Sequence, residues 1–314
     1  MNVLVTGATG FIGSAVVRSL LGRGHAVVGL VREPARGCWL EELGGSLAVG
    51  EMDRPETYAP LVSRVDAVIH TAQPKPSGRW NRRRIAAMHQ SDALMTRTLA
   101  EACLVEEKLL IYTSGAMVHA GVGEEWIDAA TGVRPCLLAR GHAEMISELA
   151  ALHRSRGLRV MVMTPGLVYG AGGFFRETVE LLLRGRYRIM GNGANYWSLV
   201  HVADLGEAYA LALESGSDGE NYFVSDKVPL RRREVIDRVT DALGLRRVGR
   251  VPAWVVGLWL GFPLVEAINA SIRMRSGHAQ ECLGWVPRYA SFDEGLLPAL
   301  EELRLSGGVG LTSP

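Results

Sequence analysis

Short apolar runs alternate with longer amphipathic segments through the first half of the chain. Each run is rich in Val, Ile and Leu, and in the segments that follow, apolar residues recur every three or four positions, as in a helix buried on one face. This alternation is typical of a parallel sheet wrapped by helices, so we predict an α/β, doubly wound parallel sheet. The predicted strands are Val3–Thr6, Ala26–Val31, Leu47–Val49, Val65–His70, Lys108–Thr113, Leu158–Met163 and Asn221–Val224.

Helices are predicted at Phe11–Leu21, Ala86–Cys103 and Pro135–Arg154, and the first is stopped by Gly22 and Gly24. Glycine is favoured just past a helix end because it adopts a left-handed conformation without strain.

The regular alternation fades from about Gly170, which indicates a second, smaller part of the molecule. We therefore expect a sheet domain from residues 1–169 and 200–228. A smaller, discontinuous C-terminal portion takes residues 170–199 and 229–305, and residues 306–314 form a flexible tail.

The longest apolar stretch, Ala253 to Val265, holds 13 residues, includes Pro263 and is followed by Glu266. It is too short to cross a bilayer and predicts a buried or interfacial helix. The chain opens directly on apolar residues with no basic region before them, which does not fit a secretory signal.

The charge balance narrows the classes of partner. The 314 residues carry 34 Lys+Arg and 33 Asp+Glu, a net charge of +1, whereas nucleic acids and anionic membranes attract a large basic excess. We therefore expect neither as a partner. The four cysteines show no Cys-x-x-Cys spacing, so we predict no metal site and free thiols in a reducing cytoplasm.

A glycine motif links the first predicted strand to the first predicted helix. Gly7 permits a tight turn, Gly10 lets a pyrophosphate approach the backbone, and Gly13 allows the helix to pack closely on the strand. The unpaired amides at the positive end of the helix dipole would then hold the anion. The residues predicted to contact a dinucleotide here are Gly7, Thr9, Gly10, Phe11, Ile12 and Gly13.

The end of the second strand selects the dinucleotide, because an arginine there favours a 2′-phosphate and an acid favours a ribose hydroxyl. Arg32 follows the strand directly, so NADP(H) is favoured. Glu33 comes next and keeps NAD(H) as the alternative.

These features, with several later motifs, make the chain resemble the extended short-chain dehydrogenases/reductases, the NAD-dependent epimerase/dehydratase group. The later motifs include Val65-Asp66-Ala67-Val68-Ile69-His70-Thr71-Ala72, Tyr112-Thr113-Ser114, Thr164-Pro165-Gly166-Leu167-Val168-Tyr169-Gly170, Trp197-Ser198-Leu199-Val200-His201 and Leu283-Gly284-Trp285. The resemblance spans roughly residues 1–300 and implies a Rossmann-like fold. It also implies cofactor contacts at Glu51, Met52, Thr71, Ala72, Gln73, Pro165, Gly166 and Val168.

Members of this family usually carry a Tyr-x-x-x-Lys pair on a long helix and a serine at the end of the preceding strand. With Glu144 taken as the glutamate four residues after the lysine, the resemblance assigns the lysine position to Arg140 and the tyrosine position to Cys136. The serine position falls on Gly115 or, with a one-residue offset, on Ser114. The usual asparagine of the earlier helix maps, less securely, to Asp92.

The chemistry of this altered pair has two interpretations. Arg140 can donate hydrogen bonds to the cofactor ribose but cannot lose a proton. If Cys136 shares its helix face, the guanidinium favours a thiolate that acts as nucleophile or base. In the alternative, Cys136 is an inert thiol that fills the vacated tyrosine site.

Other residues are predicted at the cleft. His119 stands where relatives usually have tyrosine and can replace the missing acid, since histidine titrates near neutral pH; its alternative is an ordinary loop histidine. Gln73 is a candidate for substrate contact because it follows the fourth strand at its carboxyl end. Tyr169, Tyr196 and Trp197 are candidates for the pocket wall or else for interior packing. A basic run at Arg79 and residues 82–84 indicates an anionic substrate or a solvated face.

Three functions fit the sequence. The first is an NADP(H)-dependent reductase or epimerase acting on a small-molecule carbonyl or hydroxyl, with an unusual proton donor. The second is a cyclase, isomerase or lyase without net redox chemistry, and the third is a non-catalytic nucleotide-binding sensor or partner protein. Relatives often pair through the two long helices, so a homodimer is the oligomer that the resemblance implies.

Overall fold

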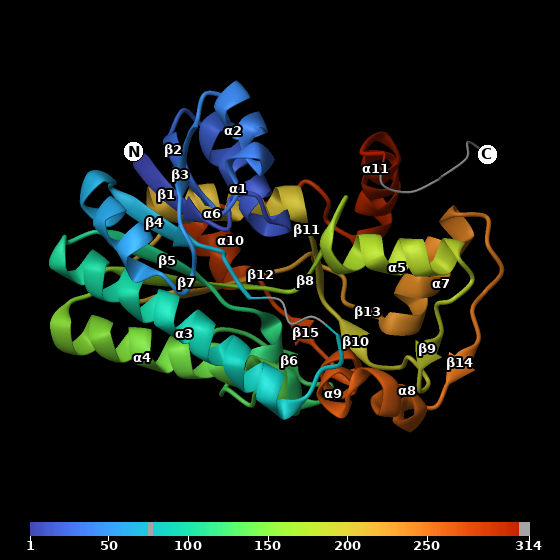
Figure 1. The fold of residues 1–314 in the computed structure, drawn as a ribbon. Helices are drawn as coiled ribbons and strands as arrows, with labels where there is room; N and C mark the ends of the chain where they lie inside the picture. Colours follow the sequence, from blue (N-terminus) through green and yellow to red (C-terminus); the bar gives the residue numbers. More distant parts are fainter. Residues whose placement is uncertain (75–77, 308–314) are drawn as a thin grey trace.

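A seven-stranded sheet, parallel throughout, forms the centre of the molecule (Figure 1). The computed structural model describes residues 1–74 and 78–307. In order across the sheet, the strands are β3 (Ser46–Val49), β2 (Ala26–Val31), β1 (Asn2–Thr6), β4 (Ala67–His70), β5 (Leu109–Thr113), β7 (Val160–Pro165) and β12 (Asn221–Val224). The predicted α/β doubly wound fold is confirmed, and the predicted strand ends differ by at most two residues.

Helices cover both faces of this sheet, as Figure 1 shows. One face carries α1 (Phe11–Gly22), α6 (Val202–Ser215) and α10 (Gly277–Leu283), and the other carries α3 (Arg82–Val105) and α4 (Arg140–Arg156). The short helix α2 (Cys38–Glu42) lies beside β3.

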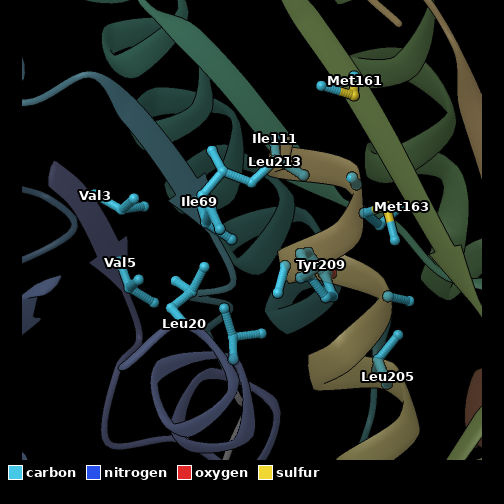
Figure 2. Close-up of a cluster of buried hydrophobic side chains, with 14 of the residues drawn as sticks. Val3, Val5, Leu20, Ile69, Ile111, Met161, Met163, Leu205, Tyr209 and Leu213 are labelled. Atoms are coloured by element: carbon cyan, nitrogen blue, oxygen red, sulfur yellow. The ribbon is translucent and has the colours of Figure 1, made fainter. Parts of the chain in front are cut away.

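Side chains alternate between the two layers, because successive residues of a strand point to opposite faces. Val3 and Val5 enter the core beneath α1 and α6, where Figure 2 shows them, whereas Leu4 enters the core beneath α3 and α4. On β5, Ile111 joins the first core and Tyr112 the second. Burial on both faces explains why these strands are almost continuous apolar runs.

The smaller part of the molecule is built from short strand pairs and helices. The strand pairs are β8 (Leu167–Tyr169) with β11 (Leu199–His201), β9 (Ile189–Met190) with β14 (Arg250–Val251), β10 (Tyr196–Trp197) with β13 (Leu230–Arg231), and β6 (Trp126–Ile127) with β15 (Arg273–Met274). The remaining helices are α5 (Gly173–Leu183), α7 (Arg232–Ala242), α8 (Ala253–Leu260), α9 (Phe262–Asn269) and α11 (Phe292–Leu305).

This part has its own hydrophobic core, which includes Tyr169, Phe175, Ile236 and Phe292. Within the predicted range 229–305, however, α10 packs on the sheet rather than here. The division into domains stays a prediction. Of the predicted tail, residues 308–314 lie outside the described residues.

The apolar stretch from Ala253 forms two helices, α8 and α9, separated by Gly261. Gly261 has φ +104°, and a Cβ there would overlap the Trp80 carbonyl oxygen, so only glycine fits this junction. Trp254 is 63% exposed and Trp259 78% exposed, so the prediction of a buried helix is wrong and the interfacial alternative stays a prediction. Across residues 1–74 and 78–307, no helix is long and apolar enough to span a membrane.

The fully buried Trp285 anchors the C-terminal segment to the sheet domain. Its ring belongs to the core under α1 and α6, and its indole N–H donates to the Asp204 carbonyl oxygen at 2.9 Å. We expect Trp285→Ala to lower the free energy of unfolding by about 3–5 kcal/mol, because it removes an aromatic side chain from a packed core. Urea denaturation would measure the loss.

The matched control is Trp259→Ala, which deletes the same side chain from a site that is 78% exposed. Its effect should stay within about 0.5 kcal/mol. Equal losses for the two variants would contradict the packing assigned to Trp285.

Candidate active site

A cavity of about 460 Å³ opens where several strands of the sheet end. Gln73 lies beyond the end of β4, Ser114 directly follows β5, and Gly166 directly follows β7. Open parallel sheets bind ligands at this carboxyl edge. The other lining residues are Ile12, Pro74, Trp80, Met88, His89, Asp92, Gly115, Ala116, Met117, Leu138, Ala139, His142, Pro165, Leu167, Val168, Trp197, Ser198, Ala267, Ala270 and Ile272.

The glycine turn has the close packing that its sequence predicts. Gly7 has φ +69°, and a Cβ there would lie 2.8 Å from the Ala72 backbone nitrogen. A Cβ on Gly13 would overlap the Gly7 carbonyl oxygen, so α1 approaches the turn as closely as a bare backbone allows. The Gly10 amide donates to the Gly7 carbonyl oxygen at 2.8 Å and closes the turn.

The start of α1 is arranged to accept an anion. Gly10 is its N-cap, no side chain caps the helix, and its first turn holds no acidic residue. The first amides of a helix lack partners within the helix and carry its positive dipole end. Next to the turn, the Thr71 hydroxyl donates to the Thr6 carbonyl oxygen at 2.7 Å, which fixes the end of β4 against β1.

The other predicted cofactor residues lie along the same edge. Arg32 is exposed directly after β2, and the Glu51 amide donates to the Thr57 hydroxyl at 3.1 Å beyond β3. The Phe11 ring packs against Gly172 and Gly173, which ties α1 to the smaller part of the molecule. The predicted cofactor residues that line the cavity are Ile12, Gln73, Pro165, Gly166 and Val168.

The premise that Cys136 and Arg140 share a helix face is wrong. The helix α4 begins at Arg140, and Cys136 precedes it in extended conformation, φ −68° and ψ 167°, at the start of a 3-10 turn. Cys136 is buried against Val118 and Ala267, and burial raises the pKa of its thiol, which opposes thiolate formation. Arg140 is exposed and does not line the cavity, so the geometry opposes a reactive thiolate at Cys136 and does not support a ribose contact by Arg140. The burial of Cys136 favours the alternative interpretation, an inert thiol.

His119 also lies away from the cavity. Its ring packs on Phe223 of β12 with centroids 5.3 Å apart, and its Nδ1 lies 3.2 Å from the Gly132 carbonyl oxygen. The 3-10 segment Ala116–Val122 turns the side chain to this side, and burial lowers the pKa of the imidazole. The placement just beyond the cofactor's reactive end is therefore wrong.

The four predicted substrate residues separate into two pairs. Gln73 and Trp197 line the cavity. Tyr169 is fully buried in the core of the smaller part, against Phe175 and Phe292, and does not line the cavity. Tyr196 instead stacks its ring under two guanidinium groups and is also absent from the lining.

Ser114 is the predicted catalytic residue that does face the cavity. It is 4% exposed, and its hydroxyl has no hydrogen-bond partner among the described residues. A buried hydroxyl without a partner costs free energy, and a ligand group that paired with it would remove that cost.

Behind Ser114 lies a buried polar cluster that the sequence motifs do not predict, formed by Asp92, Tyr112 and His142. The Tyr112 hydroxyl lies 2.6 Å from His142 Nδ1 and 3.4 Å from Asp92 Oδ2. His142 Nδ1 lies 3.9 Å from the same carboxylate oxygen. Asp92 is 5% exposed, and its Oδ1 has no partner among the described residues.

Burial controls the protonation of this cluster. It raises the pKa of Asp92 to about 6, against a weaker lowering by the Tyr112 hydrogen bond. Burial, and secondarily the charge of His89, lowers the pKa of His142 to about 4, while the pKa of Tyr112 is raised well above its usual value. Within residues 1–74 and 78–307, no three His, Cys, Asp or Glu side chains gather to hold a metal ion.

The periodicity of α4 is the sequence signal that points to His142. Gly141, Met145 and Leu149 are the buried residues of α4, and their spacing of four marks the face that packs inward. Leu138 and His142, also four apart, line the cavity beside that face. The chain therefore presents a Leu-x-x-x-His pair to the cavity, two residues along from the pair predicted from Glu144.

The comparisons with known proteins agree with this geometry. Residues 3–225 match the NAD dependent epimerase/dehydratase family, and the chain belongs to that family. It is 27% identical to a 2-alkyl-3-oxoalkanoate reductase of Stenotrophomonas maltophilia, over 88% of this chain and 85% of that protein. It is 28% identical to a 3-diazoavenalumate denitrifying reductase of a Streptomyces species, over 94% of this chain and 99% of that protein.

Among solved structures, the chain resembles a dTDP-glucose 4,6-dehydratase from Streptomyces venezuelae with NAD and TYD bound. The TM-score is 0.81 and the identity 24%, over 98% of both chains. At this identity the likeness establishes the fold, and the predicted membership of the extended short-chain family is confirmed.

The glycine turn can be tested at Gly10, where an added Cβ would lie 3.0 Å from the Gly7 carbonyl oxygen and crowd the start of α1. We expect Gly10→Ala to weaken the binding of a nicotinamide dinucleotide by about 10- to 100-fold, since the methyl group occupies space against the helix amides. Calorimetric titration would measure the dissociation constant.

The matched control is Gly22→Ala at the other end of α1, where an added Cβ meets no atom within 4 Å. Its dissociation constant should equal that of the wild type. Unchanged binding in Gly10→Ala would show that no pyrophosphate lies on this turn.

Proposed function

We propose that the protein is a nicotinamide-dinucleotide-dependent reductase of small, uncharged carbonyl compounds that carry apolar substituents. The observation that carries the proposal is the cavity itself, which runs from Ile12 beside the glycine turn to Ser114 and His142. A dinucleotide held at the turn and a substrate held beside these polar groups would share one space. The two relatives named above are both reductases, which supports a reduction. Their printed substrates, an oxoalkanoate and a diazoavenalumate, are carboxylates, so the choice of an uncharged substrate rests on the lining of this cavity and not on the relatives.

The cavity wall supports an apolar substrate. It includes Trp80, Met88, Met117, Leu138 and Ile272. No arginine or lysine of residues 1–74 and 78–307 contributes to the lining, whereas a diphosphate or carboxylate substrate requires a cationic partner in such a buried place. The exposed arginines at positions 79 and 82–84 lie outside the lining and fit a solvated face.

The chain has the groups that a dinucleotide requires. The residues at the turn, Gly7 to Gly13, would hold the pyrophosphate, and Pro165, Gly166 and Val168 would lie beside the nicotinamide. The bound dihydronicotinamide would supply hydride to the carbonyl carbon. The Ser114 hydroxyl, which has no partner among the described residues, would donate a hydrogen bond to the carbonyl oxygen.

A homologous series of methyl ketones tests the proposed reaction. We expect kcat/KM to rise by about 4-fold for each added CH₂ until the cavity is filled, since burying one contributes about 0.8 kcal/mol. Oxidation of the reduced nicotinamide, followed by its absorbance, gives the rates.

The matched substrates are keto acids of the same length, with a carboxylate at the far end of the chain. They should be reduced much more slowly, because the described lining offers that charge no cation. Binding of the dinucleotide without reduction of any ketone would contradict the proposal and favour a redox-silent enzyme or a sensor.

The preference for NADP(H) rests on Arg32, which is exposed directly after β2 where a 2′-phosphate would lie. We expect Arg32→Ala to raise the dissociation constant for NADPH by about 10-fold, the loss of one charge-assisted contact, and to leave that for NADH unchanged. Fluorescence titration with both cofactors would measure the change.

The control for this variant is Arg64→Ala, an exposed arginine whose carbonyl oxygen accepts from Asn2 at the opposite edge of the sheet. An equal change for both cofactors in Arg32→Ala would refute a 2′-phosphate contact and leave Glu33 and NADH as the better assignment. The homodimer through the long helices and the cytoplasmic location stay predictions.

A further inference from the structure

The polar cluster at the cavity joins three elements of the sheet domain. Asp92 comes from the middle of α3, Tyr112 from β5, and His142 from the first turns of α4. Tyr112 and Ser114 lie two residues apart along β5 and its extension, so their side chains leave the backbone on the same side. The cluster therefore stands directly behind the hydroxyl that would bind the carbonyl oxygen.

The hydrogen bonds of Tyr112 decide which nitrogen of His142 carries a proton. The hydroxyl lies close to both His142 Nδ1 and Asp92 Oδ2, but it has a single proton to donate. With Asp92 ionised, Tyr112 donates to the carboxylate, Nδ1–H donates to the Tyr112 oxygen, and Nε2 is left as an acceptor. With Asp92 protonated, the carboxyl donates to Tyr112, Tyr112 donates to Nδ1, and Nε2 carries the proton.

The Nε2 atom of His142 carries this change of protonation to the cavity. The His142 ring lines the cavity, and Nε2 has no hydrogen-bond partner among the described residues. The protonation of Asp92 thus determines whether the cavity meets a proton donor or a proton acceptor.

Among the described residues, Asp92 is the carboxylate of this cluster, and the titratable groups around it are His89, His70 and Tyr209. From α3, His89 Nε2 lies 3.0 Å from the Leu138 carbonyl oxygen. From β4, His70 lies between the hydroxyls of Thr6 and Thr96, at 2.7 and 3.1 Å, and burial lowers its pKa to about 3. From α6, Tyr209 has its hydroxyl 2.6 Å from that of Thr113.

We propose that His142 is the catalytic acid and base of this site, and that Tyr112 and Asp92 are positioning residues that pass the proton to and from it. The proposal rests on the proposed function, since it names the proton source for the same reduction. It replaces Cys136 and His119, which lie outside the cavity lining.

The proton transfers balance in the reducing direction. The Nε2–H bond of His142 breaks as an O–H bond forms on the substrate oxygen, Nδ1 takes the phenol proton, and the phenolate oxygen takes the proton of the Asp92 carboxyl. His142 and Tyr112 end neutral, and Asp92 ends as a carboxylate. The electron pair that reduces the carbonyl carbon arrives as hydride from a dihydronicotinamide dinucleotide. Alcohol oxidation runs the same transfers backwards.

The first test is the pH dependence of the two directions. Because burial raises the pKa of Asp92 to about 6, kcat for reduction should fall as pH rises through about 6, and kcat for oxidation should rise.

His142→Gln should lower kcat by about 100-fold or more, with KM and the dinucleotide dissociation constant nearly unchanged. His278→Gln, on α10 and outside the cavity, is the matched control.

Tyr112→Phe keeps the ring and interrupts the relay, so it should lower kcat and abolish the pH dependence near 6. Thermal unfolding of each variant separates loss of folding from loss of catalysis. If His142→Gln keeps kcat within about 3-fold of the wild type, catalysis by His142 is refuted.

A second readout needs neither cofactor nor turnover. Nitrogen NMR of His142 in the protein alone should show the proton on Nε2 below about pH 6 and on Nδ1 above it, and Asp92→Asn should abolish the switch. A tautomer that does not change across this range overturns the relay, whatever the activity. A wild type that switches but reduces no ketone would instead refute the proposed function and leave the relay standing.

Discussion

The close approach of α1 to the ends of β1 and β4 is the constraint on which the molecule depends. Gly13 brings the helix against the Gly7 carbonyl oxygen, and Gly7 in turn lies against the backbone of Ala72. Any side chain at these positions would push the helix away from the sheet. The same absence of side chains leaves the first amides of α1 bare, so the packing that forms the layer also forms the anion site.

That constraint also fixes where the cavity can lie. The sheet is parallel, so all its strands end at the edge where α1 begins, and the residues after β4, β5 and β7 meet there. Successive side chains of β5 point to opposite faces of the sheet, so neighbouring residues pack in different cores. Ile111 supports α1 and α6, whereas Tyr112 turns toward α3 and α4 and reaches the polar cluster.

The sheet could be predicted from the sequence because its signals are local. A buried parallel strand is a short β-branched run, and Asn221–Val224 was located to the residue. The start of α4 is different, because distant residues set it. The Leu137 amide donates to Glu266 of α9, 129 residues away, at 3.4 Å, and no periodicity near Cys136 reports that contact.

The prediction for His119 was wrong for the same reason, a contact with a residue distant in the sequence. Its ring packs on Phe223, about a hundred residues later in the chain. The apolar helices α8 and α9 show the opposite limit. Their composition predicts burial, yet the apolar side chains that they bury are few, among them Val265 and Ala267 of α9. The end of α8 is also held through its backbone, where the Trp80 amide donates to the Leu260 carbonyl oxygen at 2.8 Å. Trp80 lines the cavity, whereas Trp259 of α8 is exposed.

The carboxylate of Asp92 is the feature that packing alone does not explain. Burial raises its pKa from 3.8 to about 6, so the folded protein binds more protons than the unfolded chain between those values, and stability falls as pH rises through that window. This raised pKa corresponds to about 3 kcal/mol of folding stability lost at neutral pH. An asparagine would keep a hydrogen bond to Tyr112 without this cost. A group that titrates beside the cavity, at a cost in stability, is what an acid–base site requires and what a purely structural site would avoid.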